Sequence, residues 1–463
     1  MAEELHELDC VVVGAGTAGS AAAYHLARAG FRVALLEARA LDAAGARWVN
    51  GVPPWMFDRA GIAKPRYPER RGNGNPFLLQ GKNGEGRIKL AENPVGNVDT
   101  RLLVARLQDL ARKSGVTLFE HVRIQHLDLE NDRPVSLNVE AQTPEGTPAK
   151  ICFRARLFVD ATGLSGAVRH LVPEISRHTP PVPRSHLCLA AQEVLTVKDP
   201  AGARAFLEKN SLRPGESLSF TGLSGGFSAL MVTLSKNLEE VELLAGAIAE
   251  GPHLKGPELL KKTREENPWI GETLFGGTGQ IPLRRPYDRL AAPGIALVGD
   301  AACQVFPAHG SGTGIGMVAA RILAESLQGK PDPGSFEATW AYQSAFQREY
   351  GGLLASYDVF RRLSQSLSEG EVESLLASGL LTENGCRAGL IEEMPRLSPP
   401  DLLATLRGAV VAPRLALRLL PALARMPLVA SRYRRYPQEP DLGRLKSWSR
   451  SVARLFGEKP DVT

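Results

Sequence analysis

Cysteine is scarce and irregularly placed in this sequence. Only five cysteines occur among 463 residues, and no two of them form a Cys-x-x-Cys pair. The sequence therefore argues against a disulfide framework, a zinc site and a redox-active dithiol. We predict no metal site, and scattered thiols favour a reducing cytoplasm.

Long apolar runs are missing as well. No stretch reaches the ~18 uncharged apolar residues that a membrane-spanning helix needs. The first residues, Met-Ala-Glu-Glu-Leu-His-Glu, are acidic, where a secretory signal would be basic. The net charge of +5 says little about partners, and no recognised nucleic-acid-binding module accompanies it. We therefore predict a cytoplasmic protein that binds no nucleic acid.

A strand–turn–helix pattern stands near the N-terminus. An apolar run ends at Gly14, a glycine turn follows, and an alanine-rich helix stops at Gly30. Gly14 allows the tight turn, and Gly16 lets the backbone approach a pyrophosphate. Gly19 lets the helix pack closely on the strand. Glu37 ends the next apolar strand, where it can accept hydrogen bonds from a ribose. This combination predicts dinucleotide binding, and an ordinary tight turn that binds nothing is the alternative.

A second glycine-rich stretch lies far along the chain. A buried strand over 295–298 ends at Gly299-Asp300, and the glycine-rich turn 310–316 feeds a helix over 317–327. Asp300 can accept a hydrogen bond from a sugar hydroxyl; as an alternative, it caps a helix. The N–H groups of the turn and the helix dipole can stabilise negative charge on a bound ring system.

The segments between these motifs read as strands and helices of a second unit. Leu187–Val197 and Leu218–Leu234 are predicted strands, the latter interrupted at Gly225-Gly226, and residues 238–250 and 257–266 are predicted helices. A helix is expected over 101–114 and a strand over 155–160. The natural interpretation is a sheet that is covered by helices and inserted in the main fold.

Three motifs now stand in order along the chain. They are GAGTAG with Glu37, the Asp-Ala-Thr-Gly of 160–163, and VGDAACQVFPAHGSGTGIG of 298–316. Together they resemble the FAD-dependent oxidoreductases of the glutathione-reductase-2 (p-hydroxybenzoate hydroxylase-like) superfamily, over about residues 7–345. The third motif is most similar to that of the geranylgeranyl reductase family, through Gln304-Val305, Pro307 and the glycine turn.

The resemblance implies an α/β fold with three parts. A Rossmann-type FAD-binding domain is expected over 1–180 and 281–345. A sheet-plus-helix substrate domain is expected over 181–280, and a basic helical C-terminal region over 346–463.

The resemblance also implies which residues contact FAD. The first glycines face the pyrophosphate, with two nearby arginines, and Glu37 faces the adenosine ribose. Val122 touches the adenine through its backbone, Asp300 holds the ribityl chain, and Gly310–Thr313 lie against the isoalloxazine. The predicted FAD set is Gly14, Gly16, Ala18, Gly19, Glu37, Arg39, Arg47, Arg101, Val122, Thr162, Gly163, Asp300, Gly310, Gly312 and Thr313.

His309 is the predicted catalytic residue. It replaces the threonine that usually follows the proline in the reductase family, and histidine exchanges protons near neutral pH. A structural, hydrogen-bonded histidine is the alternative. Four residues are predicted to line the substrate cavity, although core packing explains the tryptophans equally well: Trp48, Asn50, Trp55 and Phe227.

The resemblance implies reduction of a carbon–carbon double bond in a small apolar substrate, with isoprenoids as one class. Two alternatives stay open: a flavin monooxygenase (a hydroxylase or epoxidase) and a non-catalytic flavin-binding accessory protein. The family's cysteine after the second strand is missing, since residues 38–60 contain none. No second dinucleotide motif occurs, so an external donor must supply electrons: NAD(P)H, a quinol or a redox partner.

The C-terminal region carries a strongly basic stretch. Between Arg407 and Arg454 there are eleven basic residues, and Glu439 and Asp441 are the only acidic ones. The arginines at 414, 418, 425 and 432 would share one helical face, with leucines and Met426 opposite. Pro421 and Pro427 argue against one straight helix. Such a stretch either lies on an anionic membrane, which makes the protein peripheral to it, or forms a helical cap with a solvated basic face.

Overall fold

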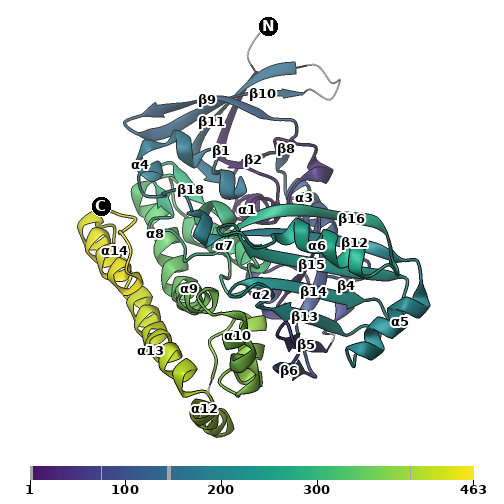
Figure 1. Cartoon of the computed structure of the whole chain (residues 1–463). Helices are drawn as coiled ribbons and strands as arrows, with labels where there is room; N and C mark the ends of the chain where they lie inside the picture. The colour runs from purple at the N-terminus through teal and green to yellow at the C-terminus, as the bar shows by residue number, and fades with distance from the viewer. Residues whose placement is uncertain (1–3, 75, 143–147, 397) are drawn as a thin grey trace.

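The computed structural model describes residues 4–74, 76–142, 148–396 and 398–463. Its main sheet is the parallel sheet that the first motif predicts, in the order β17-β18-β11-β1-β2-β8 (Figure 1). Strands β1, β2, β8, β11 and β18 run parallel, whereas β17 is antiparallel. Strands β9 and β10 extend the first half of β11 as an antiparallel arm. The bounds are β1 Glu4–Val13, β2 Val33–Leu36, β8 Thr117–Phe119, β9 Arg123–Glu130, β10 Arg133–Gln142, β11 Pro148–Asp160, β17 Ala291–Ala292 and β18 Ile295–Leu297.

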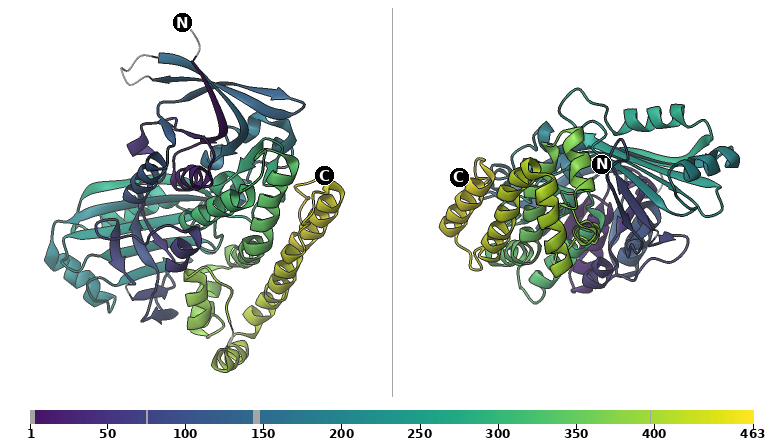
Figure 2. Two further views of the ribbon diagram at one scale, coloured as in Figure 1. Left: turned by 180° about the vertical axis from the view of Figure 1, so that it is seen from behind. Right: turned by 60° about the horizontal axis from the view of Figure 1, so that its bottom comes forward.

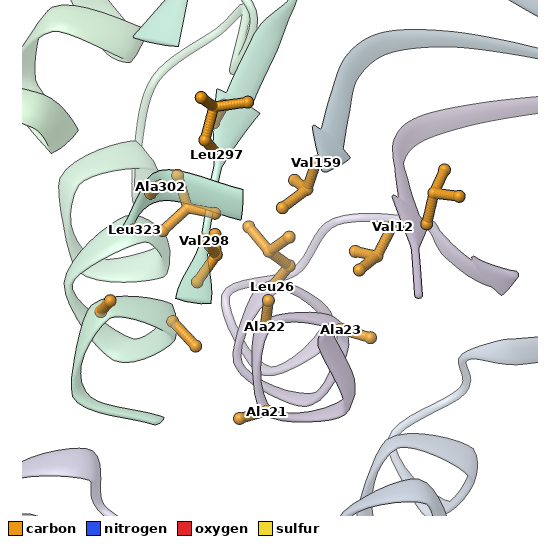
Figure 3. Close-up of a cluster of buried hydrophobic side chains, with 14 of the residues drawn as sticks. Val12, Ala21, Ala22, Ala23, Leu26, Val159, Leu297, Val298, Ala302 and Leu323 are labelled. Carbon is orange, nitrogen blue, oxygen red and sulfur yellow. The ribbon is translucent and has the colours of Figure 1, made fainter. Parts of the chain in front are cut away.

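Helices α1, α3, α7 and α8 pack around this sheet, and small side chains bring them close. Figure 3 shows Ala22 and Leu26 of α1 next to Val159 of β11 and Val298, with Leu323 of α7 beside them. All of these side chains are fully or almost fully buried. Alanines on the inner face of α1 let two helices and a sheet share one core. The bounds are α1 Thr17–Arg28, α3 Thr100–Lys113, α7 Thr313–Leu327 and α8 Phe336–Phe346.

A second sheet has the order β16-β12-β15-β14-β13-β5-β6. Helix α6 packs against β12 and β15 of this sheet. Strands β5 and β6 come from the N-terminal part of the chain, so the second sheet draws on residues outside 181–280; the predicted domain limits themselves stay a prediction. The bounds are β5 Phe77–Gln80, β6 Arg87–Leu90, β12 Leu187–Val197, β13 Ser217–Thr221, β14 Ser228–Leu234, β15 Glu240–Ile248, β16 Ile270–Pro282, α5 Pro200–Lys209 and α6 Gly256–Glu266.

One predicted helix is wrong. Residues 238–250 contain strand β15, which pairs with β12 on one side and β14 on the other. Val241, Leu243 and Ala245 are buried in a hydrophobic cluster that also contains Leu259 and Leu260 of α6. Pairing on both edges decides the conformation here, and it outweighs the helical propensity of Glu, Leu and Ala.

A small third sheet and the remaining helices complete the fold. Strands β3, β7 and β4 form that sheet, and α2 packs against α7. Helices α9 to α14 make the predicted helical C-terminal region, and α12, α13 and α14 lie along one edge of the molecule (Figures 1 and 2). The bounds are β3 Val49–Val52, β4 Arg70–Asn73, β7 Gly96–Asp99, α2 Pro54–Ala60, α4 Pro173–Ser176, α9 Gly352–Gln365, α10 Glu369–Ala377, α11 Glu383–Leu390, α12 Pro399–Val411, α13 Pro413–Arg434 and α14 Leu442–Phe456.

Helix α13 is continuous through Pro421 and Pro427. Its inner face packs on α9, and the buried side chains include Leu415, Leu419 and Met426 as predicted. Leu423, expected on the same face, is instead 46% exposed. Within the described residues, no helix is both long and apolar enough to cross a bilayer.

Candidate functional site

One large cavity lies between the two sheets and the C-terminal helices. It measures about 1480 Å³, and its walls come from the glycine turns after β1 and β18, from the face of the second sheet and from helices α9 to α13. Ligand pockets usually enclose about 300–1,000 Å³, so this one can hold two ligands at once. One end is polar and rich in backbone N–H groups, and the other is apolar.

The polar end is built on the turn between β1 and α1. Gly14 has φ +101°, and a Cβ there would lie closer than 3.0 Å to the Ala161 carbonyl oxygen. A Cβ on Gly19 would overlap the Gly14 carbonyl oxygen. Gly14 therefore lets the turns after β1 and β11 approach each other, and Gly19 lets α1 pack on the first of these turns. Gly14 and Gly16 both line the cavity, but a Cβ on Gly16 would meet only Gly45, at 3.4 Å, so Gly16 leaves room for a ligand above the helix N-terminus.

Glu37 stands at the end of β2, on the cavity wall. Its Oε2 accepts from the Ala15 backbone N–H at 2.9 Å, and its Oε1 accepts from the Arg39 N–H at 3.1 Å. A carboxylate has about four acceptor sites, so two backbone donors hold it in place and leave capacity for ribose hydroxyls.

The Asp-Ala-Thr-Gly turn after β11 is held by its own aspartate. Asp160 Oδ1 accepts from the Thr162 N–H at 3.0 Å, and Oδ2 accepts from the Arg169 N–H at 2.7 Å. Asp160 is fully buried, and both oxygens of its carboxylate accept hydrogen bonds from the backbone that follows it. Thr162 and Gly163 thereby stay on the cavity wall.

Asp300 carries a carboxylate that accepts no hydrogen bond from the described residues. It sits in the single 3₁₀ turn Gly299–Ala302 after β18 and faces the cavity, and it does not cap α7, which begins after Gly312. Burial raises its pKa to about 6. A buried acceptor without a partner is costly unless a ligand supplies the donor. Asp300 is therefore suited to a ligand hydroxyl.

His309 lies on the cavity wall in the loop before α7. Its Nε2 is 3.2 Å from the Gly389 carbonyl oxygen, and because a carbonyl only accepts, Nε2 carries the hydrogen. Burial lowers the pKa of His309 to about 4, while the accessible third of the side chain faces the cavity. The ring is therefore neutral near pH 7.

Glu392 lies behind His309, with its Oε1 4.0 Å from the histidine Nε2. This carboxyl is 1% exposed, and Oε1 has no hydrogen-bond partner among the described residues. Burial raises the pKa of Glu392 well above its usual range, against a smaller opposing effect of the Ser311 hydroxyl. The carboxyl is thus harder to ionise than an ordinary glutamate. No sequence signal points to Glu392, since it follows no motif and lies 83 positions from His309.

Most of the predicted site residues come together around this cavity. The residues that line it are Gly14, Gly16, Ala18, Glu37, Arg39, Trp48, Asn50, Val122, Thr162, Gly163, Phe227, Asp300, His309, Gly310, Gly312 and Thr313. Their grouping at the carboxyl ends of parallel strands is the usual place for a dinucleotide. Their individual contacts with FAD or substrate stay predictions.

Four predicted residues do not line the cavity. Arg101 pairs with Asp99 at 2.7 Å and its guanidinium lies over the Phe275 ring. Trp55 donates to the Ile391 carbonyl oxygen at 2.8 Å. Arg47 donates to the Asp42 carbonyl oxygen at 2.9 Å, and Gly19 is enclosed by the turn before it.

The apolar end has a wall that the sequence did not indicate as a unit. Side chains from the second sheet meet side chains from α9, α10, α11 and α13 there. They include Phe77, Leu79, Met231, Tyr357, Phe360, Leu375, Leu376, Leu390, Leu419 and Met426. Because they come from distant parts of the chain, only the fold assembles them.

Known proteins resemble the chain in both sequence and fold. A family model described as FAD dependent oxidoreductase matches residues 9–171. The digeranylgeranylglycerophospholipid reductase of Sulfolobus acidocaldarius is 24% identical, with 97% of each chain covered. Digeranylgeranylglycerophospholipid reductase 2 of Methanopyrus kandleri is 27% identical over 85% of this chain and 95% of its own. The solved geranylgeranyl bacteriochlorophyll reductase-like protein of Thermoplasma acidophilum has a TM-score of 0.70 at 17% identity, covering 90% of this chain and all of that one.

The chain is an FAD-dependent oxidoreductase. It is similar to the geranylgeranyl reductases, as its third motif predicts. Its cofactor is FAD, and the cavity fits that group: the Gly14 turn, the free acceptor sites of Glu37 and the unpartnered Asp300 lie along one wall. The oxidoreductase requires an external electron donor.

Proposed function

We propose that this oxidoreductase reduces carbon–carbon double bonds in the isoprenoid chain of a lipid. The observation that carries the proposal is the continuity of one cavity from a dinucleotide cradle to a long apolar wall. An isoprenoid chain is apolar and extended, so burial on such a wall favours its binding. The relatives named as digeranylgeranylglycerophospholipid reductases support the same substrate class.

Reduced FAD, when bound, supplies a hydride. The protein's part is to hold both reactants and to provide the proton that completes the reduction. We assign Gly16 to the pyrophosphate, Glu37 to the adenosine ribose and Asp300 to the ribityl hydroxyls. In this arrangement the loop from Gly310 to Thr313 faces the reacting ring. Asn50 donates to the Thr313 Oγ1 at 2.8 Å and fixes the start of α7 next to that loop.

His309 and Glu392 form the proton source in this proposal. One substrate carbon gains the hydride, the other gains a proton, and the double bond becomes single. A neutral histidine is a poor acid, whereas the imidazolium is a strong one. Because Nε2 already carries a hydrogen, the proton for the substrate is one that the ring takes up from solvent on Nδ1, and the ring returns to its neutral form when the substrate carbon receives it. We therefore assign proton delivery to His309, and to Glu392, whose Oε1 lies 4.0 Å from Nε2, the stabilisation of the protonated ring.

Trp48 and Phe227 stay proposed substrate contacts. Both lie on the cavity wall and belong to the apolar cluster of Ile281 and Leu283. The identity of the electron donor, NAD(P)H, a quinol or a redox protein, is also a proposal, as are the cytoplasmic location and peripheral membrane contact.

Single-turnover reduction tests the function. The holoenzyme is reduced without air and mixed with a digeranylgeranylglycerophospholipid, and flavin reoxidation is followed together with product mass. We expect reoxidation at the rate of product formation, with two hydrogens gained per reduced bond.

The proton source is tested in the same reaction. Glu392→Gln should slow product formation about 100-fold, within the usual contribution of general acid catalysis, and leave FAD occupancy unchanged. Glu393→Gln, an exposed neighbour, is the control. Equal rates for the Glu392→Gln variant and the native enzyme would remove Glu392 from the mechanism.

A further inference from the structure

Large apolar side chains gather on the outside of α12 and α13. Their exposure ranges from 46% to 82%, and they lie within 27 consecutive residues. They are Leu402, Leu403, Leu406, Val410, Val411, Leu417, Leu420, Leu423 and Leu428. Single exposed leucines are ordinary on soluble proteins, but a contiguous set of this size marks an interaction surface.

The helical period puts most of this set on one outward face. At 100° per residue, Leu417, Leu420 and Leu428 fall within about 80° of one another. The buried residues Leu415 and Met426 point the other way, against α9 and its neighbours. On α12, Leu402, Leu403, Leu406 and Val410 share one outward arc in the same way. We call these two arcs the outer stripe: Leu402, Leu403, Leu406 and Val410 on α12, and Leu417, Leu420 and Leu428 on α13.

Positive charge accompanies the outer stripe. Between residues 402 and 438 the chain contains seven arginines and neither Asp nor Glu. On α13, Arg414 and Arg425 fall beside the stripe and are exposed, and no carboxylate in the described chain pairs with them. Arg418 is different, because it pairs with Glu371 of α10. The surface is therefore apolar with a cationic flank.

The cavity reaches the surface next to the outer stripe. Leu423 of α13 and Met394, just before α12, line the cavity and are also exposed. Thr405 of α12 and Pro427 of α13 belong to the same wall. The helices that carry the stripe thus form the outer end of the apolar part of the cavity.

We propose that α12 and α13 lie on an anionic membrane, with the outer stripe among the acyl chains, and that the isoprenoid lipid enters the cavity between Met394 and Leu423. Helices that bind bilayers in this way combine an apolar face with arginines toward the headgroups. The entry path rests on the proposed function, because it assumes a membrane lipid as substrate.

A second copy of the chain is a less suitable partner for this surface. A twofold contact through the stripe would place the arginines of one copy opposite those of the other. No acidic residue between 402 and 438 offsets that repulsion. An anionic membrane offers acyl chains to the leucines and negatively charged headgroups to the arginines.

Vesicle flotation tests the membrane contact without any turnover. The holoenzyme is mixed with vesicles of phosphatidylcholine alone or with phosphatidylglycerol, at low and high salt. We expect binding to the anionic vesicles that weakens with salt. The triple variant Leu406→Gln, Leu417→Gln, Leu420→Gln should bind at least about 10-fold more weakly, since apolar area drives insertion. The control changes three leucines of similar exposure elsewhere: Leu5→Gln, Leu171→Gln and Leu274→Gln.

The arginines are tested separately. Arg414→Gln with Arg425→Gln should remove most of the preference for anionic vesicles, whereas Arg112→Gln, an exposed arginine of α3, should not. The proposal is overturned if the native protein stays unbound, if the stripe variant floats as well as the native protein, or if light scattering shows a dimer that the stripe variant dissociates. Single-turnover activity on detergent-dispersed lipid, measured in parallel, reports on the proposed function independently.

Discussion

Gly16 offers a way to test the FAD site without disturbing the fold. Its backbone is extended, with φ −70° and ψ −170°, which any residue adopts. A Cβ added there would meet Gly45 Cα at 3.4 Å, an ordinary contact, and would otherwise point to the cavity. Gly16→Ala should therefore leave the free energy of unfolding of the apoprotein unchanged.

The same methyl group should weaken FAD binding. A hydrogen bond to a charged acceptor such as the pyrophosphate contributes about 1.5–3 kcal/mol. Holding the pyrophosphate away from one N–H group should raise the Kd for FAD about 10- to 100-fold. Flavin fluorescence titration of the apoprotein gives the Kd, and urea unfolding gives the stability.

Gly19→Ala should show the opposite pattern. Its Cβ would overlap the Gly14 carbonyl oxygen, so α1 must shift and the apoprotein itself should lose about 1–3 kcal/mol. Gly370→Ala in α10, where a Cβ meets nothing within 4 Å, is the control and should change neither quantity much. Unchanged FAD affinity in Gly16→Ala, with the stability also unchanged, would refute the placement of the pyrophosphate.

Three further predictions concern buried charged and titratable groups. Asp300→Asn should raise the Kd for FAD about 10- to 100-fold, because the ribityl hydroxyls lose a charged acceptor. The apoprotein should keep its stability, because the lost carboxylate has no partner in the described chain. A Kd equal to that of the native protein would count against the ribityl contact. Burial lowers the pKa of His25 to about 4, below its unfolded value, so its contribution to stability is present above about pH 6.5 and is lost as the pH falls toward 4. Between about pH 7 and 4.5, the free energy of unfolding in urea should fall by about 2–3 kcal/mol more for the native protein than for His25→Gln. An equal pH dependence of this free energy in the two proteins would contradict the prediction. Asp461 accepts from Arg284 at 2.7 Å, and both side chains are buried. Asp461→Asn should therefore lower the free energy of unfolding by about 3–5 kcal/mol, whereas Lys459→Gln, at an exposed position, should leave it unchanged. Equal losses in the two variants would mean that the ion pair does not stabilise the fold.

The sequence predicts the local parts of this structure that depend on few contacts. The turn at Gly14 follows from the spacing of its glycines, and strand β12 has the predicted bounds. Strand β15 was missed because its conformation depends on pairing with strands far along the chain. Strand β5 also depends on a distant partner, because it pairs with β13 in the second sheet. Nothing between residues 69 and 97 indicates that partner.

The candidate site divides in the same way. The dinucleotide wall was predicted because its residues belong to three motifs with known roles. The apolar wall and Glu392 were not, since side chains from the second sheet and from α9 to α13 meet only after folding. Arg101 does not line the cavity and its guanidinium is paired with Asp99, and its contact with FAD stays a prediction.

The anaerobic reaction of reduced holoenzyme with an isoprenoid lipid separates a reductase from a monooxygenase. Flavin absorbance and the mass of the lipid are followed together, first without oxygen and then with it. We expect the flavin to reoxidise without oxygen and the lipid to gain two hydrogens per reduced bond. A lipid left unchanged without oxygen, and carrying an added oxygen atom once air is admitted, would contradict the proposed double-bond reduction and identify a monooxygenase.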